Sequence, residues 1–465
     1  MFKKILIANR GEIAVRVIRA CRELGVATLA VYSAADESSL HVSHADEAVC
    51  IGPPPAAQSY LVMDNLIMAA LTHGADAIHP GYGFLAESAA FSRLCAANDL
   101  TFIGPSAESI ELMGDKAMAR TTMTAAGVPV TPGSDGEIAD VAAAEEVART
   151  IGLPVMVKAS AGGGGKGIRI VHEADALAAA LRQASNEAQS AFGNGAVYVE
   201  KYIASPRHVE IQVLADGAGH AIHLGERDCS IQRRHQKLIE EAPSPAVSPE
   251  LRARMGEAAV EAARAAGYKG AGTVEFLLDP AGHFYFMEMN TRVQVEHCVS
   301  EMVTGIDIVK TGIRIAAGEG LPLRQSDVTI SGHSIEFRIN AEDPANGFLP
   351  SPGTVTVWSP PGGPWVRLDS HVYQGYVVPP FYDSLLGKLV VWGRDRDEAI
   401  ARGRWALAQF RVAGVATTIP FHRRVLDHPL FLAGTVSTHF IDEDLDGDQA
   451  NGVEGAAESG PNVRP

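Results

Sequence analysis

The sequence predicts an α/β protein of several domains, and three observations support that prediction. Short apolar runs alternate with helical stretches over residues 4–103, which is the pattern of an open sheet covered by helices. A glycine-rich loop joins two strands near residue 160, and strands with Pro/Gly turns follow from Gly332. The chain has 465 residues, so its length alone indicates about three domains.

The first part is interpreted as an open, parallel, Rossmann-like sheet. Strands are predicted at 4–8, 28–32, 75–78 and 100–103, with a helix at 13–24. Such sheets bind ligands at the carboxyl ends of their strands, so Asn9–Glu12 and Pro80–Glu87 are candidate site loops. A nicotinamide dinucleotide is disfavoured because the first loop has one glycine where the fingerprint needs three.

Composition narrows the class of partner. The net charge of −16 argues against nucleic acid and against an anionic membrane. The five cysteines form no CxxC pair, which disfavours a zinc site or a disulfide framework. The apolar start is interrupted at Asn9–Glu12, too soon for an export signal, and no run approaches the ~20 apolar residues of a membrane span. We expect a soluble, cytoplasmic protein.

The glycine-rich loop, Ala159–Gly167, is predicted to cover phosphate groups. Consecutive glycines let backbone N–H groups approach phosphate oxygens. It is not a Walker A loop, because Lys166 is followed by Gly167 and the loop joins two strands, 155–158 and 168–171. A flexible linker would look similar, but the flanking strands and Lys158 favour a phosphate-covering lid.

The segment Glu288–Glu296 carries the densest polar pattern. Polar residues occupy every second position, so an extended strand would place them all on one face. A solvent-facing edge strand would show the same alternation. The mixture of acids, amides and an arginine favours a metal-and-anion site over a merely solvated face.

A hairpin upstream of this segment predicts where the metal would bind. The turn Asp279–Gly282 pairs residue 278 with 283, so Glu275 faces residue 286 and Glu288 is its diagonal neighbour, ~7–8 Å away. Together with Asn290 these carboxylates can hold Mg²⁺ through oxygen ligands. The alternative is a pair of exposed acids with salt-bridge partners.

Two further segments have open interpretations. The basic cluster Glu226–Lys237 has the charge density of a solvated helix, but in an acidic chain it also suits phosphate or bicarbonate. His208, in the alternating stretch 208–213, is either a core histidine or a site residue.

Taken together, these segments resemble the biotin carboxylase family of the ATP-grasp superfamily. The resemblance runs from Met1 to about Leu445. It is carried by five motifs, at 7–14, 79–87, 113–116, 227–237 and 288–297. It implies an ATP-grasp architecture with four parts: an N-terminal α/β domain (1–114), an ATP-grasp domain (115–331) with a mobile glycine-rich lid (about 131–204), a C-terminal mixed α+β domain (332–445), and a tail (446–465) expected to be disordered.

The resemblance also implies a role for each matching residue. ATP contacts are expected from Lys116, Lys158, Gly164, Gly165, Glu200, Lys201, Tyr202, Ile203, His208, Gln232, His235, Glu275 and Glu288. Mg²⁺ or Mn²⁺ is expected at Glu275, Glu288 and Asn290. Bicarbonate is expected among Lys237, Arg292, Gln294, Val295 and Glu296, and biotin at Tyr82 and Arg338. The expected catalytic residues are Lys237, Arg292, Glu296 and Arg338, with Glu296 as the general base.

The implied reaction is ATP-dependent carboxylation of biotin by bicarbonate through carboxyphosphate. No biotin-attachment motif or carboxyltransferase domain is present in the sequence, so we expect biotin on a separate carrier protein and separate carboxyltransferase subunits. Arg19 and Glu23 match a dimer-contact helix, which implies a homodimer. The expected holoenzyme is acetyl-CoA carboxylase; a two-subunit pyruvate carboxylase or another acyl-CoA carboxylase is the alternative.

Two other functions compete with this one. Another ATP-grasp ligase would use an amino acid or purine acceptor, which Tyr82, Arg338 and Lys237 disfavour. A nucleotide-sensing protein without turnover should lack Arg292, Glu296 or a metal acid, and all are present. Two departures from the family pattern are Cys298, where proline is common, and Lys166, where arginine is common.

Overall fold

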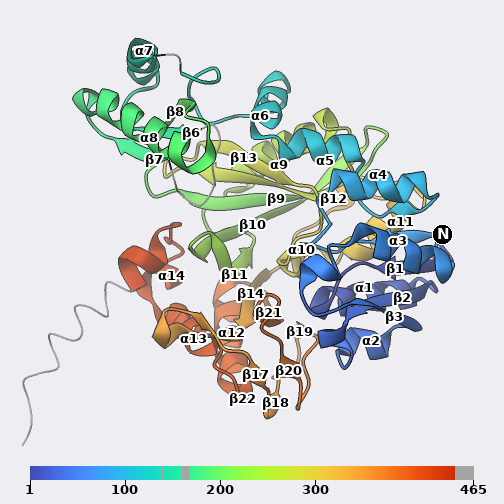
Figure 1. Ribbon diagram of the computed structural model, residues 1–465. Helices are drawn as coiled ribbons and strands as arrows, with labels where there is room; N and C mark the ends of the chain where they lie inside the picture. Colours follow the sequence, from blue (N-terminus) through green and yellow to red (C-terminus); the bar gives the residue numbers. More distant parts are fainter. Residues whose placement is uncertain (139, 160–166, 446–465) are drawn as a thin grey trace, which may run out of the picture.

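A computed structural model describes residues 1–138, 140–159 and 167–445 (Figure 1). The expected lid-tip residues Gly164, Gly165 and Lys166 lie outside the described residues, as does the tail 446–465. Among the described residues, no helix combines the length and apolar character needed to cross a membrane.

The N-terminal part is a five-stranded parallel sheet with strand order β3-β2-β1-β4-β5. Its strands are β1 (Lys4–Ile7), β2 (Ala27–Ser33), β3 (Glu47–Gly52), β4 (Ala77–His79) and β5 (Thr101–Phe102). Its helices are α1 (Gly11–Glu23), α2 (Leu40–His44), α3 (Met63–Thr72), α4 (Ala89–Ala97) and α5 (Ala107–Gly114). The predicted Rossmann-like parallel sheet is confirmed. The strand order reverses between β1 and β4, so the loops that follow these two strands meet at one edge.

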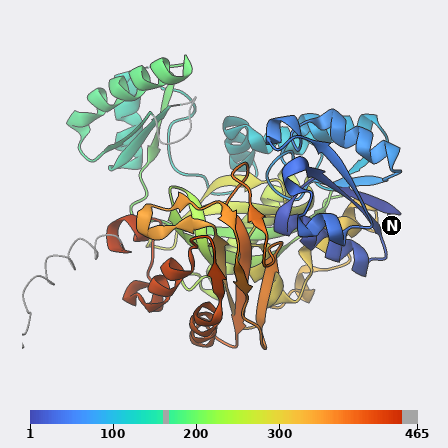
Figure 2. The ribbon, with the colours of Figure 1, turned by 60° about the horizontal axis from the view of Figure 1, so that its bottom comes forward.

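A small antiparallel sheet forms a separate unit above the body (Figures 1 and 2). Its order is β7-β6-β8, and its strands are β6 (Val155–Ala159), β7 (Ile168–Val171) and β8 (Val197–Lys201). Helices α7 (Val141–Ile151) and α8 (Leu177–Phe192) pack on it around a core of its own. The predicted strands on either side of the glycine loop are therefore present, and they pair directly.

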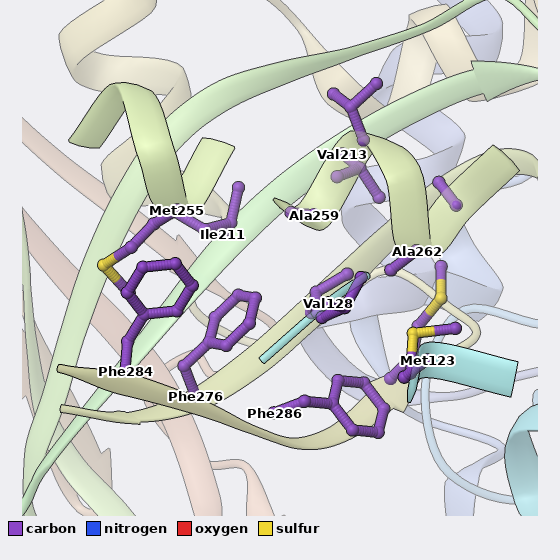
Figure 3. Packing of buried hydrophobic residues seen from close by; sticks show 14 of the residues in the cluster. Met123, Val128, Ile211, Val213, Met255, Ala259, Ala262, Phe276, Phe284 and Phe286 are labelled. Carbon is purple, nitrogen blue, oxygen red and sulfur yellow. The ribbon is translucent and has the colours of Figure 1, made fainter. Parts of the chain in front are cut away.

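The largest element is an eight-stranded sheet with strand order β13-β12-β9-β10-β11-β14-β21-β19. Its first half contains β9 (Arg207–Asp216), β10 (Ala221–Arg233), β11 (Gln236–Ala242), β12 (Lys269–Leu278) and β13 (Phe284–Asn290). Helices α6 (Lys116–Ala125) and α9 (Pro249–Ala265) cover one face, where Met255, Ala259 and Ala262 meet Ile211 and Phe276 (Figure 3). Because side chains alternate along a strand, the other face of β9 presents His208, Glu210 and Gln212.

The second half of the same sheet belongs to the C-terminal part of the chain. It contains β14 (His333–Asn340), β19 (Val366–Ser370) and β21 (Leu385–Gly393). Ile335, Phe337 and Ile339 of β14 pack into the core beneath helices α12 (Arg396–Gln409) and α13 (Ile419–Asp427), so Glu336 and Arg338 face the opposite way. The polar faces of both halves therefore belong to one continuous surface.

Shorter elements complete the fold. The helices are α10 (His297–Thr304), α11 (Ile308–Ala316) and α14 (Pro429–Leu432); the strands are β15 (Glu342–Asp343), β16 (Leu349–Pro350), β17 (Gly353–Thr354), β18 (Val357–Ser359), β20 (Val377–Val378) and β22 (Arg411–Ala413).

Candidate active site

The two loops at the strand-order reversal are tied together as the parallel sheet predicts. Asn9, after β1, donates hydrogen bonds from Nδ2 to the carbonyls of Pro80 and Tyr82, both at 2.7 Å. The Tyr82 hydroxyl donates to the carboxylate of Glu12. This places Tyr82, a predicted biotin contact, beside the N-terminus of α1.

Charged side chains form a row across four strands of the large sheet. Arg227 of β10 lies opposite Glu210 of β9, which lies opposite Glu275 of β12, and Glu275 in turn lies opposite Glu288 of β13. Adjacent carboxylates repel one another, so such a row needs cations to offset its charge. The side chains of Arg227 and Glu210 are fully buried, which makes that requirement stringent.

Lys237 supplies one of these cations. It follows the tight β10–β11 turn, where Arg234 and His235 adopt φ values of 49° and 66°, the left-handed conformation of a two-residue hairpin. Its Nζ donates to Glu210 at 2.6 Å, to Glu275 at 2.8 Å and to Glu296 at 2.8 Å. Burial works to lower the pKa of Lys237, but these carboxylates outweigh it and hold the pKa well above its usual value. The helix typical of such charge density is absent here, because residues 226–237 form a hairpin.

Arg227 supplies the second cation and uses its whole donor set. Its Nε donates to Glu210 at 2.5 Å, and its two terminal nitrogens donate to Gln212, Ser300, Thr273 and Gln294 at 2.7–3.1 Å. The planar guanidinium thus joins three strands to the loop that contains Gln294. This fixes the loop against the sheet.

Glu296 links Lys237 to Arg338 of β14, in the second half of the same sheet. Arg338 donates to Glu240 at 2.6 Å and to Glu296 at 3.0 Å. Burial alone would raise the pKa of Glu296, but Lys237, Arg338 and Arg227 hold it far below its usual range. Glu296 is therefore ionised and 2% exposed, with a cation on each side.

The predicted register of the β12–β13 hairpin is wrong. Leu278 pairs with Phe284 rather than residue 283, and the register shifts between Glu275 and Phe276, so Glu288 lies directly opposite Glu275. The shift leaves Met287 as an extra residue on β13, which is the geometry of a β-bulge. The two acids are therefore closer neighbours than the diagonal pairing predicts.

The acids at this end of the row fit a divalent cation. One Glu275 oxygen, Oε1, accepts hydrogen bonds from Asn290 and Gln294 at 2.9 and 2.7 Å, and the other, Oε2, lies 2.8 Å from His208 Nε2. Within the described part of the chain, Glu288 has no hydrogen bond or ion pair. Partial loss of hydration and the Glu275 carboxylate raise the pKa of Glu288. An uncompensated carboxylate beside another oxygen donor is what Mg²⁺ or Mn²⁺ requires.

The loop after β13 departs from the extended strand predicted for 288–296. The strand ends at Asn290, so the residues from Thr291 to Glu296 form a loop and a turn. The predicted residues converge nonetheless: Arg292 donates to Asn290 at 2.9 Å and to Glu87 at 3.0 Å, and Gln294 reaches Glu275. Val295 lies between Gln294 and Glu296 in this loop.

The predicted nucleotide contacts divide between the lid and the body. On the lid, Lys158 donates to Glu200 at 2.7 Å; Lys201 ends strand β8, and Tyr202 and Ile203 follow it. On the body, Lys116 is exposed at the start of α6, while His208, Gln232 and His235 lie on β9 and the β10–β11 hairpin. His208 is a buried site residue: burial opposes its protonation, but Glu275 raises its pKa. The roles of these residues stay predictions.

Several site residues were missed from the sequence. They are Glu12, Glu87, Glu210, Arg227, Glu240 and Lys388. Glu210 and Arg227 lie in segments that the sequence singled out, but their partners depend on strand pairing. Lys388 is the single charged residue in the otherwise apolar run Leu385–Val391. A lone charge within a predicted buried strand could have identified it as a site residue.

Comparison with known proteins agrees with this geometry. Three family models match in chain order: "Biotin carboxylase, N-terminal domain" at 1–110, "Carbamoyl-phosphate synthase L chain, ATP binding domain" at 115–324, and "Biotin carboxylase C-terminal domain" at 336–443. The chain has a small sheet that flanks the glycine-rich loop and a large sheet with paired acids and cations, and it matches an ATP-binding domain over 115–324. These features define an ATP-dependent ligase of the ATP-grasp superfamily.

Individual relatives narrow the class further. The chain is 58% identical to a biotin carboxylase of Nostoc sp. over 442 residues, covering 95% of this chain and 99% of that protein. It is 55% identical to a pyruvate carboxylase subunit of Methanothermobacter thermautotrophicus, covering 95% and 90%. The solved biotin carboxylase domain dimer of the Hydrogenobacter thermophilus 2-oxoglutarate carboxylase, in complex with MgADP, ADP and bicarbonate, is 52% identical, with a TM-score of 0.86 and coverage of 95% and 98%. The chain belongs to the biotin carboxylase family.

Proposed function

We propose that the protein carboxylates biotin on a separate carrier protein, using ATP and bicarbonate. The observation that carries the proposal is Glu296, an ionised and buried carboxylate held between Lys237 and Arg338. A base flanked by two cations suits a two-step reaction. In the first step an anion loses a proton to the base, and in the second step the cations stabilise negative charge as it moves to another acceptor. The relative solved with MgADP and bicarbonate supports the choice of substrates.

A divalent cation, Mg²⁺ or Mn²⁺, would be held by Glu275, Glu288 and Asn290. When bound, it offsets phosphate charge during phosphoryl transfer. The uncompensated Glu288 carboxylate supports this assignment.

Bicarbonate would be bound by Lys237, Arg292, Gln294 and Val295, with Glu296 positioned to take its proton. A carboxylate whose pKa is held low is a weak base, so the cations that hold it must be diverted. Bicarbonate provides that diversion, because its oxygens compete with Glu296 for Lys237. The basicity of Glu296 therefore increases when the substrate is bound.

The remaining steps leave every protein group covalently unchanged, with Glu296 giving up its proton to solvent when the products leave. The deprotonated bicarbonate oxygen attacks the γ-phosphorus of ATP, releasing ADP and forming carboxyphosphate. Lys116, Lys158 and the glycine loop would hold the nucleotide phosphates. Carboxyphosphate then separates into CO₂ and phosphate, and the phosphate takes the proton from N1′ of biotin. Arg338 stabilises the ureido oxyanion while N1′ attacks CO₂, with Tyr82 beside the ring.

The rest of the nucleotide site is proposed from the lid and the hairpin. Glu200, Lys201, Tyr202 and Ile203 would meet adenine, and His208, Gln232 and His235 would meet the ribose and phosphates. Lid closure would exclude water from carboxyphosphate, which hydrolyses readily.

We also propose the assembly in which the protein works. We infer a homodimer working with a biotin carboxyl carrier protein and carboxyltransferase subunits in acetyl-CoA carboxylase; the relative solved as a dimer supports the first part. A pyruvate carboxylase is the second candidate, favoured by the Methanothermobacter relative, which is named as part of such an enzyme. We place the protein in the cytoplasm, which is supported by its five cysteines, all of them free thiols.

The test is ATP hydrolysis with bicarbonate and Mg²⁺, measured with and without free biotin. Wild-type protein should be stimulated by biotin, and Glu296→Ala should lose about a hundredfold or more of that rate. Glu261→Ala is the control, because Glu261 is an acid half exposed on α9 and paired with Arg264. Hydrolysis indifferent to biotin in the wild type would favour another ATP-grasp ligase.

A further inference from the structure

Lys388 is a fully buried cation in an otherwise apolar strand. It lies on β21, opposite Arg338 of β14 on one side and Asp369 of β19 on the other. Its side chain has 0% exposure, although charged side chains are rarely buried completely. Burial works to lower its pKa, but the acidic groups around it, Cys298 and Glu12 first, outweigh burial and raise the pKa, so Lys388 stays protonated. A fully buried charge is tolerated in a folded protein only where hydrogen bonds and opposite charges compensate it.

The partners of Lys388 come from two distant parts of the chain. Its Nζ donates to the backbone carbonyl of Val295 at 2.9 Å and lies 3.2 Å from Glu12 Oε1. Glu12 is itself buried, at 3% exposure, and accepts the hydrogen bond from the Tyr82 hydroxyl. One ammonium group therefore contacts the loop of Gln294–Glu296 directly and reaches Tyr82 through a single carboxylate.

We infer that Lys388 is a positioning residue that holds the bicarbonate loop and the biotin-side Tyr82 in place relative to Arg338. The inference rests on the proposed function, because it assigns substrates to that loop and to Tyr82. It goes further in naming a residue that touches neither substrate. Lys388 belongs to the C-terminal part, Glu12 and Tyr82 to the N-terminal part, and Val295 to the segment between them.

Both contacts of the Lys388 ammonium group are with oxygen acceptors, which explains why a cation occupies this position. The carbonyl of Val295 shares a peptide unit with the amide of Glu296, so an ammonium on this oxygen fixes the backbone that carries the proposed base. Burial raises the pKa of Glu12, and the charge of Lys388 opposes that rise, which favours the carboxylate form as an acceptor for Tyr82. A neutral side chain of the same length would fill the space and provide neither contact.

The other groups near Lys388 do not substitute for these partners. Burial raises the pKa of Glu336 and of Cys298 well above their usual values, which favours their neutral forms, and no hydrogen bond joins either group to Lys388 among the described residues. Asp369 is ionised, but it pairs with Arg367 at 2.6 Å. The Val295 carbonyl therefore remains as the hydrogen-bond acceptor of Lys388, and Glu12 as its ion-pair partner.

The test is Lys388→Met in the full chain, with the KM values for ATP, bicarbonate and biotin measured separately. We expect the KM values for bicarbonate and for biotin each to rise about tenfold, equivalent to ~1.4 kcal/mol, with the KM for ATP within about twofold of wild type. Tyr373→Phe is the matched control: it removes another contact between the N- and C-terminal parts, the 2.7 Å bond from Tyr373 to the Ser38 carbonyl, away from the loop.

A second readout is independent of turnover. Amide hydrogen exchange in residues 291–299 should become faster in Lys388→Met and stay unchanged in Tyr373→Phe. If Lys388→Met does not fold, Glu12→Gln keeps the lysine and removes only the ion pair, and it should raise the KM for biotin more than that for bicarbonate. Unchanged KM values and exchange in a folded variant would overturn the inference. Wild-type protein without biotin-stimulated hydrolysis would instead overturn the proposed function, while the exchange measurement would still report on the loop contact.

Discussion

Replacing Arg227 by methionine should be among the most destabilising single changes in the protein. The guanidinium is fully buried and donates to Glu210, Gln212, Thr273, Gln294 and Ser300. Methionine fills a similar volume but leaves these acceptors without the guanidinium, and the fully buried Glu210 carboxylate keeps, among the described residues, only the hydrogen bond from Lys237. Breaking a buried ion pair from one side typically costs about 3–5 kcal/mol.

That cost can be measured by urea unfolding. With a denaturant slope near the upper end for urea, about 3 kcal/mol per molar, the midpoint should fall by about 1 M or more. Arg264→Met is the matched control, because Arg264 is 45% exposed and pairs with Glu261 on the same helix, a contact worth less than about 1 kcal/mol. If the two variants unfold at the same urea concentration, the buried row does not depend on Arg227 and the reasoning fails.

Two further predictions concern the metal and pH. Glu288→Gln should raise the half-saturating Mg²⁺ or Mn²⁺ concentration roughly tenfold or more at an unchanged KM for biotin; a superimposable metal titration would exclude Glu288 as a ligand. His422 donates to the Arg338 carbonyl at 2.7 Å, and burial lowers its pKa to about 4, so it is neutral in the folded state. Because the unfolded chain binds the extra proton below pH ~6.5, wild type should lose about 1.4 kcal/mol more stability than His422→Gln between pH 7.5 and 5.5. Equal losses in the two proteins over that range would show that folding does not lower the pKa of His422.

The parallel N-terminal sheet could be predicted because its signals are local. Short apolar runs before Asn9 and Pro80 mark strands whose loops must meet, and the Asn9 hydrogen bonds show that they do. The flanks of the glycine loop were predicted for the same reason. The edge strand β3 was missed because its residues are half exposed and carry no clear period.

The charge row could not be predicted, because it depends on pairing between strands far apart in the sequence. Arg227, Glu210 and Glu275 share a row only through the registers of β10, β9 and β12. The bulge at Met287 shifted Glu288 by one residue, and the turn sequence alone gives no sign of it. The loop after Asn290 breaks the expected strand because Arg292, Gln294 and Glu296 each reach a different partner.

The continuous sheet has a consequence for modular engineering of this protein. The second and third family segments, 115–324 and 336–443, meet inside one hydrogen-bonded ladder, where Ile239 pairs with Phe337 and Glu240 with Glu336. Cutting the chain between them would expose two long strand edges, which are prone to aggregation. A chimera that takes its C-terminal segment, 336–443, from another member must therefore keep the β11–β14 register. A segment that is separate in the sequence is thus an integral half of one sheet.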